Sequence, residues 1–296
     1  MGFWSKLLGR EAPAARPQVQ APPMREAVPD AAMREVLSAA GLPSPRWIQV
    51  GEDVHAHVRV PGAEAVQEWT RLRALLAAHG LYPVLLGDEE SLARHAETLD
   101  DATGSAAPRV REVLSGPPFD AREWAHDKLA GEAAEMREYG EEEAARHDES
   151  VLPLLDATGP VVLPADVQPL RSFTIPTDIV SGKFLPEVTL AVMRASAPWE
   201  VPLQLRYGGW NACPLPEENA RLMRSWAERF GAEVVGISHD TVELRVARPP
   251  QDAAAALRLA VEHYAYCSDI VHQGVESIEG LAATLLGAPV WFFWWD

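Results

Sequence analysis

Apolar and polar residues follow two different periods along this chain, and these periods predict where strands and helices lie. Alternation by two predicts strands, whereas apolar residues spaced three and four apart predict amphipathic helices. In the first half, strands are expected over residues 54–60 and 81–86, with a helix over 63–79 between them. One long acidic surface helix is expected over 119–147, and a further strand near 188–193.

The second half has the clearer pattern. Strands are expected over residues 201–207, 234–237, 242–246 and 289–295. Helices are expected over residues 216–230, 251–267 and 277–286. The aromatic run at the end of the chain predicts a central strand that is buried on both faces. These elements together predict an α+β fold, a mixed sheet with flanking helices.

The two halves share a local order of elements. In each, a strand leads to a helix with a central tryptophan, Trp69 or Trp226, then to a glycine and a buried strand. The buried strands end near Asp88 and Asp240. This order predicts two related strand–helix–strand lobes, produced by duplication or by a common local arrangement that occurs twice.

Proline content and charge divide the chain into four parts. Alanine and proline dominate residues 11–30, a composition that cannot bury a core, so residues 1–46 are expected to be a disordered tail and linker. An N-terminal α/β lobe with the long acidic helix is expected over 47–150, and a connecting segment over 151–194. The C-terminal domain is expected over 195–296.

Charge and cysteine content narrow the classes of partner and compartment. The formal net charge is -17, which would repel a phosphate backbone, so nucleic acid is not an expected partner. Only two cysteines occur in 296 residues, which favours a reducing compartment, the cytoplasm. No apolar run is long enough to span a bilayer, so stable membrane insertion is not expected.

Two cysteines and two histidines form the sharpest candidate set for a metal, since zinc takes thiolate and imidazole ligands. The candidates are Cys213, His239, His263 and Cys267. Single buried cysteines and histidines more often serve as core residues, and no short Cys-x-x-Cys pair is present. We therefore expect no cofactor, with zinc as the alternative.

A wider set of side chains is expected to line one cleft if this domain binds a ligand. Strand ends and helix edges are where such clefts usually form. The set is Trp210, Asn211, Cys213, His239, Asp240, His263, Cys267 and Asp269. Within it, Cys213 is also a candidate nucleophile, with His239 or His263 as its base. Asp240 has a plainer interpretation, because an aspartate at this place can simply turn the chain between two strands.

Four stretches in the last hundred or so residues carry a resemblance to a known family. They are Gly208-Gly209-Trp210-Asn211-Ala212-Cys213-Pro214, His239-Asp240 with Glu243, Glu262 to Gly274, and Trp291 to Asp296. In this order they resemble the bacterial domain-of-unknown-function family 4253 over about residues 195–296. The resemblance implies no activity, substrate or catalytic residue, and it differs at Ser268, where the family usually has proline.

Two hypotheses of function remain open. The first is a non-catalytic protein-binding module, because the chain is acidic and lacks a recognised catalytic motif; an immunity-type role would fit. The acidic stretch 119–147 could dock a basic partner, or could simply be a solvated helix surface. The second hypothesis is an enzyme, a metal- or cysteine-dependent hydrolase with its site in the C-terminal domain.

Overall fold

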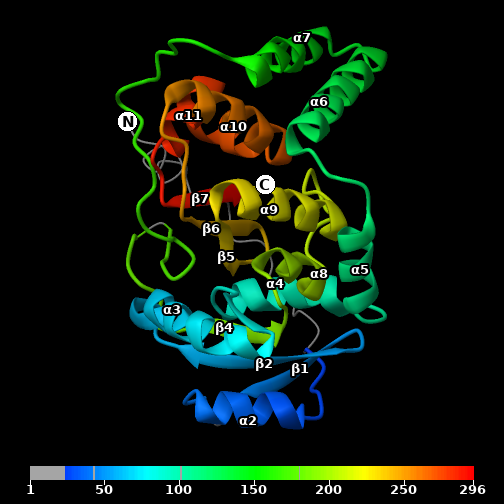
Figure 1. The fold of residues 1–296 in the computed structure, drawn as a ribbon, viewed down its shortest axis with the longest axis vertical. Helices are drawn as coiled ribbons and strands as arrows, with labels where there is room; N and C mark the ends of the chain where they lie inside the picture. The colour runs from blue at the N-terminus through cyan, green and yellow to red at the C-terminus, as the bar shows by residue number, and fades with distance from the viewer. Residues whose placement is uncertain (1–23, 43, 101, 180) are drawn as a thin grey trace.

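A computed structural model describes residues 24–296 except 43, 101 and 180. Its centre is one seven-stranded mixed sheet, in the order β1-β2-β4-β3-β5-β6-β7 (Figure 1). The strands are β1 (Arg46–Val50), β2 (Asp53–Val60), β3 (Leu81–Leu85), β4 (Val188–Arg194), β5 (Ala232–Ile237), β6 (Thr241–Val246) and β7 (Val290–Trp294). Every neighbouring pair is antiparallel except β3 and β5, which pair in parallel at Leu85 and Gly236.

Helices cover the sheet on both faces, so the α+β fold predicted from the sequence is confirmed. They are α2 (Ala31–Ala39), α3 (Ala65–Leu76), α4 (Glu89–Asp100), α5 (Ala107–Ser115), α6 (Ala121–Glu138), α7 (Glu142–Val151), α8 (Val201–Leu205), α9 (Pro216–Phe230), α10 (Ala253–Tyr266) and α11 (Ile278–Leu285). Short helical turns lie at η1 (Gly62–Glu64), η2 (Ala77–His79), η3 (Leu152–Asp156), η4 (Pro198–Glu200) and η5 (Ile270–Val275). Figure 1 shows α2 at one end of the molecule and α6 with α7 at the other.

Strand β4 lies inside the part of the sheet formed by the predicted N-terminal lobe, and the two lobes meet at the β3–β5 pair. Strand β4 follows the long segment 151–187 in the chain, yet it lies between β2 and β3 in the sheet. Val60 pairs with Val188 on one side of it, and Leu81 pairs with Arg194 on the other. The strand predicted near 188–193 is therefore confirmed, and it is buried along nearly its whole length.

The predicted glycine helix ends are also confirmed. Gly80 and Gly231 both have a φ of +63°, the left-handed conformation in which glycine ends a helix without a steric penalty. The strands that follow them are β3 and β5, the parallel pair. The helix–glycine–strand part of the proposed repeat is thus present in both halves, on neighbouring strands of one sheet.

The predicted strand over 201–207 is wrong. Alternating apolar residues suggested it, but the segment forms the short helix α8, which is buried on all sides. Pro202 stands in the first turn, where a proline suits a helix because it has no amide hydrogen to leave unbonded. Arg206 ends the helix with a φ of +52°. The second half therefore lacks the leading strand that the repeat predicted at this place.

Three further expectations need correction. The helix expected over 119–147 is two helices, α6 and α7, because Gly140 adopts a φ of +81° between them. The tail expected over 1–46 contains helix α2, whose Met33 and Leu37 are buried; residues 1–23 lie outside the described residues. The closing aromatic run forms β7, an edge strand whose faces are covered, and not a central strand.

The described residues contain no helix that is both long and apolar enough to cross a membrane.

Candidate functional site

Several of the residues predicted to share a cleft meet at the last three residues of the chain, Trp294, Trp295 and Asp296. The Asn211 side chain donates a hydrogen bond to the backbone oxygen of Asp296. The Asp269 carboxylate accepts one from the Asp296 amide at 3.1 Å. The Cys267 thiol donates to the Trp294 oxygen at 3.0 Å. We call this network of hydrogen bonds the C-terminal knot; the name refers to the hydrogen bonds and not to the topology of the chain.

His239 and Asp240 join the same knot from the turn between β5 and β6. The Trp294 indole donates to Asp240 Oδ2 at 3.2 Å, and the Trp295 amide donates to the Asp240 oxygen at 3.1 Å. His239 Nε2 lies 3.1 Å from the same carboxylate. Burial acts to raise the pKa of Asp240, but the contacts with His239, Thr241 and Ser238 together outweigh burial, so that the pKa is lowered. Asp240 also accepts hydrogen bonds from Ser238 and Thr241 on either side, as a turn residue would.

Trp210 and Cys213 lie behind the knot. The Trp210 ring packs edge to face against Trp295 and Tyr207, with centroids 6.1 Å and 5.9 Å away. Cys213 is buried, and its nearest polar neighbour is the Asn219 amide at 4.0 Å. Seven of the eight predicted cleft residues are thus tied to the knot or packed behind it.

His263 is the predicted site residue that lies elsewhere. Its ring is enclosed by three aromatic rings, Trp226, Trp291 and Phe293, at centroid distances of 4.9, 4.7 and 4.7 Å. Burial lowers the pKa of His263 well below its ordinary value, so the imidazole is neutral at pH 7. We call this the aromatic box.

Neither cysteine has the properties of a nucleophile. Both thiols are unpaired and buried, and burial raises the pKa of Cys213 to about 12 and that of Cys267 well above its ordinary value. A nucleophilic cysteine needs a lowered pKa, since the thiolate is the reactive form. Among the described residues no group of three or more His, Cys, Asp or Glu side chains could hold a metal ion. The proposed zinc ligands Cys213, His239, His263 and Cys267 therefore do not converge.

The structure also contains a polar cluster that the sequence did not single out. It lies between β2, α4 and α8 and consists of His55, His57, His95, Gln204, Arg206 and Tyr207. The rings of His55 and His57 are 6.4 Å apart on one face of β2, and the rings of His95 and Tyr207 are also 6.4 Å apart. We call this cluster the histidine layer. Each of its side chains is at least nine-tenths buried.

Much of the hydrogen-bonding capacity of this layer is unused. Neither ring nitrogen of His55 or His57 has a hydrogen-bond partner among the described residues. The same holds for Gln204 Oε1, Arg206 Nε and the Tyr207 hydroxyl. Buried polar groups are nearly always paired in folded proteins, so such a concentration of unpaired ones is unusual and marks the layer as a candidate functional element.

A signal for the layer was present in the sequence, in the strand expected over 54–60. Valine and alanine alternate there with polar residues, and His55 and His57 are two of these polar positions. In the structure α4 and α8 cover that face, so His55 and His57 are buried as fully as Ala56. The His-x-His spacing on one strand face was the available clue. Its partners from α4 and α8 could not be inferred, because α4 was not predicted and α8 was expected to be a strand.

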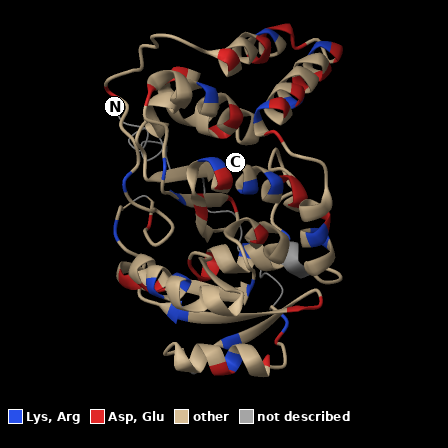
Figure 2. Ribbon diagram, in the orientation of Figure 1, with Lys and Arg blue, Asp and Glu red and all other residues tan. Residues whose placement is uncertain are grey.

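The surface offers a different candidate at the far end of the molecule, the hairpin formed by α6 and α7. Figure 2 shows acidic residues along both helices. Seven acidic side chains of the hairpin are exposed: Glu123, Asp127, Glu135, Glu138, Glu141, Glu142 and Glu143. Tyr139 stands at the tip between the two helices and is 75% exposed.

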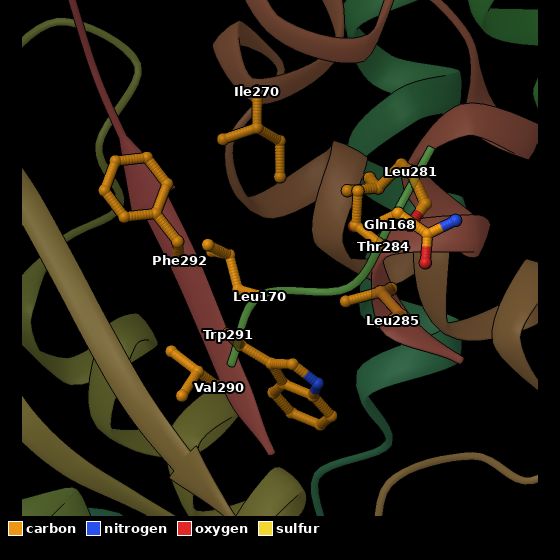
Figure 3. Close-up of a pocket in the computed structure, with 9 residues that line it drawn as sticks. All are labelled: Gln168, Leu170, Ile270, Leu281, Thr284, Leu285, Val290, Trp291 and Phe292. Atoms are coloured by element: carbon orange, nitrogen blue, oxygen red, sulfur yellow. Dashed lines mark hydrogen bonds between the residues drawn. The ribbon is translucent and has the colours of Figure 1, made fainter. Parts of the chain in front are cut away.

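A small pocket lies beside the edge strand β7 (Figure 3). Its space is about 20 Å³, enough for about one water molecule. The lining is mostly apolar and comes from α11, β7 and the segment around Leu170. The Trp291 indole nitrogen has no hydrogen-bond partner among the described residues. The size of this pocket suits an ordered water better than an organic ligand.

Comparison with known proteins supports the resemblance seen in the sequence. Residues 189–296 match the family described as Domain of unknown function (DUF4253). The match begins at β4, a few residues before the domain boundary expected at 195. No curated protein and no solved structure matches the chain. The C-terminal part of the chain is therefore similar to the DUF4253 family.

Proposed function

We propose, starting from similarity to the DUF4253 family, which has no assigned activity, that the protein is a non-catalytic protein-binding module that docks a basic partner protein on its α6–α7 hairpin. One observation carries the proposal: Tyr139 is 75% exposed at the hairpin tip and is flanked in the sequence by exposed glutamates. Exposed tyrosines are common hot spots of protein interfaces, and charge complementarity guides the approach of a partner.

The hairpin is held well enough to present such a surface. Arg137 of α6 pairs with Glu149 of α7, and Arg137 Nε also lies 3.8 Å from Glu142. From the body of the protein, the Tyr264 hydroxyl of α10 donates to Asp148 at 2.7 Å. A surface fixed before binding loses less conformational entropy when a partner arrives.

The carboxylates define the chemistry of the partner. Glu138, Glu141, Glu142 and Glu143 lie next to Tyr139 in the sequence. Arg137 is already paired with carboxylates, and Arg146 donates to the Glu142 backbone oxygen one helical turn away. A partner with a lysine- or arginine-rich face would complement the glutamates. Neutralisation of a basic protein, as in an immunity-type role, would use such a face. We place this binding in the cytoplasm, in keeping with two buried and unpaired thiols.

The test places a photo-crosslinking amino acid at position 139 of the full chain in the source cells. The control carries it at position 114, because Leu114 is an exposed apolar residue on a different helix, α5. The proposal expects a crosslinked partner from position 139 that is absent from position 114.

The identified partner is then purified and its affinity is measured. Tyr139→Ala should weaken binding about tenfold to a hundredfold, whereas Leu114→Ala should leave it unchanged. Binding should also weaken as salt is added. Equal crosslinking from the two positions, or an affinity that Tyr139→Ala does not change, would refute the proposal.

A further inference from the structure

The histidine layer lies at the boundary between the β1–β2 hairpin and the helices α4 and α8. It is separate from the α6–α7 surface. On one side of it is the hairpin β1–β2, and on the other are α4 and α8. Strand β1 is at the edge of the sheet, so the hairpin is connected to the rest of the sheet only through the pairing of β2 with β4. Contacts across the layer therefore help to decide whether the hairpin stays in place.

Beside the layer, the side chain of Arg206 makes polar contacts across this boundary. Arg206 Nη2 of α8 donates to the Gly104 oxygen at 2.8 Å and lies 3.4 Å from Asp53 at the start of β2. Asp53 also accepts hydrogen bonds from the Ser105 hydroxyl at 2.9 Å and the Ala106 amide at 2.6 Å. Both oxygens of the Asp53 carboxylate thus already have partners.

The charges around the layer would make added protons unfavourable. Arg46 faces it from β1, Arg206 from α8, and His239 from the β5–β6 turn. Among the described side chains, Asp53 and Asp240 are carboxylates that act on the layer. Asp53 is engaged with Arg206, and Asp240 with His239 and the Trp294 indole. A protonated His55 would therefore lie close to the buried Arg206 guanidinium, whereas the Asp53 carboxylate that attracts it is already paired with that guanidinium.

The protonation properties of the three histidines agree with this geometry. Burial lowers the pKa of His55 and of His95 to about 4, and that of His57 well below its ordinary value. The charge of Asp53 opposes this effect at His55. At pH 7 all three rings are neutral in the folded protein. Once exposed to water they would bind protons near pH 6.5.

We propose that the histidine layer is a proton-sensitive latch: acidification releases the β1–β2 hairpin from α4 and α8 while β5, β6 and β7 stay folded. The sign follows from linkage. The released state binds more protons than the closed state below pH 6.5, so lowering the pH favours release. Because three histidines lie in one layer, exposure of one exposes the others, and the response to pH is steeper than that of a single group.

The test is hydrogen–deuterium exchange of the full chain between pH 7 and 4.5, corrected for the pH dependence of intrinsic exchange. The opening constant of residues 46–60 should rise at least tenfold for each histidine released, and β6 (241–246) should still be protected at the pH where residues 46–60 have lost their protection. Loss of protection from both segments at the same pH would overturn the proposal, because acidification would then unfold the whole protein.

Two double variants sharpen the test. His55→Gln with His57→Gln removes two protonation sites and keeps polar side chains of similar size, so the rise at residues 46–60 should shrink at least tenfold. His79→Gln with His126→Gln changes two exposed histidines and should leave the rise unchanged. A full rise in the first double variant would overturn the proposal. If near-ultraviolet circular dichroism shows that this variant does not fold at pH 7, the single variants and the wild-type profile decide.

Discussion

The aromatic box and the histidine layer both bury neutral histidine, but they do so in opposite ways. In the box, the His263 ring lies among the rings of Trp226, Trp291 and Phe293. The preceding residue, Glu262, is charged and fully paired. Its carboxylate accepts from the Trp226 indole at 3.0 Å and from both terminal nitrogens of Arg229. In the layer, imidazoles lie beside each other and beside Arg206, and several polar atoms have no partner.

The difference shows that burial alone does not define what a histidine does. His263 acts mainly as a flat ring that fills space between other rings. His55 and His57 contribute little packing specificity of this kind. All three rings have a lowered pKa and so make the folded state sensitive to protons, but in the layer this sensitivity is concentrated beside the β1–β2 hairpin. Four predictions can break or sharpen this comparison, from the largest expected effect to the smallest.

Acid should destabilise the protein, and His55 and His95 of the layer should contribute a large part of the loss, beside the buried His263. The folded pKa values of His55 and His95 are about 4, below the unfolded value near 6.5, so their stabilising contribution is complete above pH 6.5 and is lost as pH falls towards 4. Each shift corresponds to roughly 3 kcal/mol, so the two together amount to roughly 6 kcal/mol. Urea unfolding at pH 7, 5.5 and 4.5 measures this loss. A free energy of unfolding that stays flat across this range would contradict it.

Trp226→Ala should cost about 3–5 kcal/mol, because a fully buried indole at the centre of the aromatic box is replaced by a cavity. Its ring contacts His263, Tyr266, Trp291 and Phe293. Trp210→Ala, at a half-buried indole behind the C-terminal knot, is the control and should cost clearly less. Denaturant midpoints compare the two variants, and an equal loss would show that the box is no better packed than the knot.

Glu262→Gln should cost about 1–3 kcal/mol, because it removes the charge that both Arg229 nitrogens and the Trp226 indole share. The control is Glu228→Gln, whose partner Arg224 lies one helical turn away on the exposed surface of α9. That change should cost less than about 0.5 kcal/mol. Thermal unfolding at neutral pH separates the two. If Glu228→Gln lowered the free energy of unfolding as much as Glu262→Gln, the buried Glu262–Arg229 pair would stabilise the protein no more than the exposed pair does.

His57→Leu should change stability at pH 7.5 by less than about 1 kcal/mol, because the ring nitrogens that it removes have no hydrogen-bond partner. His263→Leu, which loses three ring contacts, should be the more costly of the two. Calorimetry at pH 7.5 gives both values. A loss above about 3 kcal/mol for His57→Leu would mean that its nitrogens are hydrogen-bonded after all, for example through ordered water.

The sequence predicted well the elements whose signals are local. Helix 216–230 has apolar residues at helical spacing and a glycine just after its end, and the structure has α9 at Pro216–Phe230 with Gly231 in the left-handed conformation. The prediction of a strand over 201–207 was wrong because a run of apolar residues is compatible with a short buried helix as well as with a strand. Strand β1 and helices α2, α4 and α5 were not predicted. Their signals are weak on their own, and tertiary packing decides their structure.

The candidate site shows the same limit. The C-terminal knot was partly foreseen, since His239, Asp240, Asn211 and Asp269 lie at strand and helix ends that a local pattern can identify. The histidine layer combines β2, α4 and α8, which are far apart in the chain. Only the order of strands in the sheet brings them together, and that order, with β4 between β2 and β3, is not encoded in any one segment.

The position of β4 also determines when the sheet can form during translation of this protein. While a ribosome makes residues 46–85, strands β2 and β3 have no partner for the edges that will later face each other, because that partner is β4 at Val188–Arg194. In the nascent chain, β2 and β3 therefore cannot form their final pairing until β4 leaves the ribosome. Strand β4 belongs to the DUF4253 match, so the N-terminal strands can complete their sheet only after the first strand of that domain has been translated.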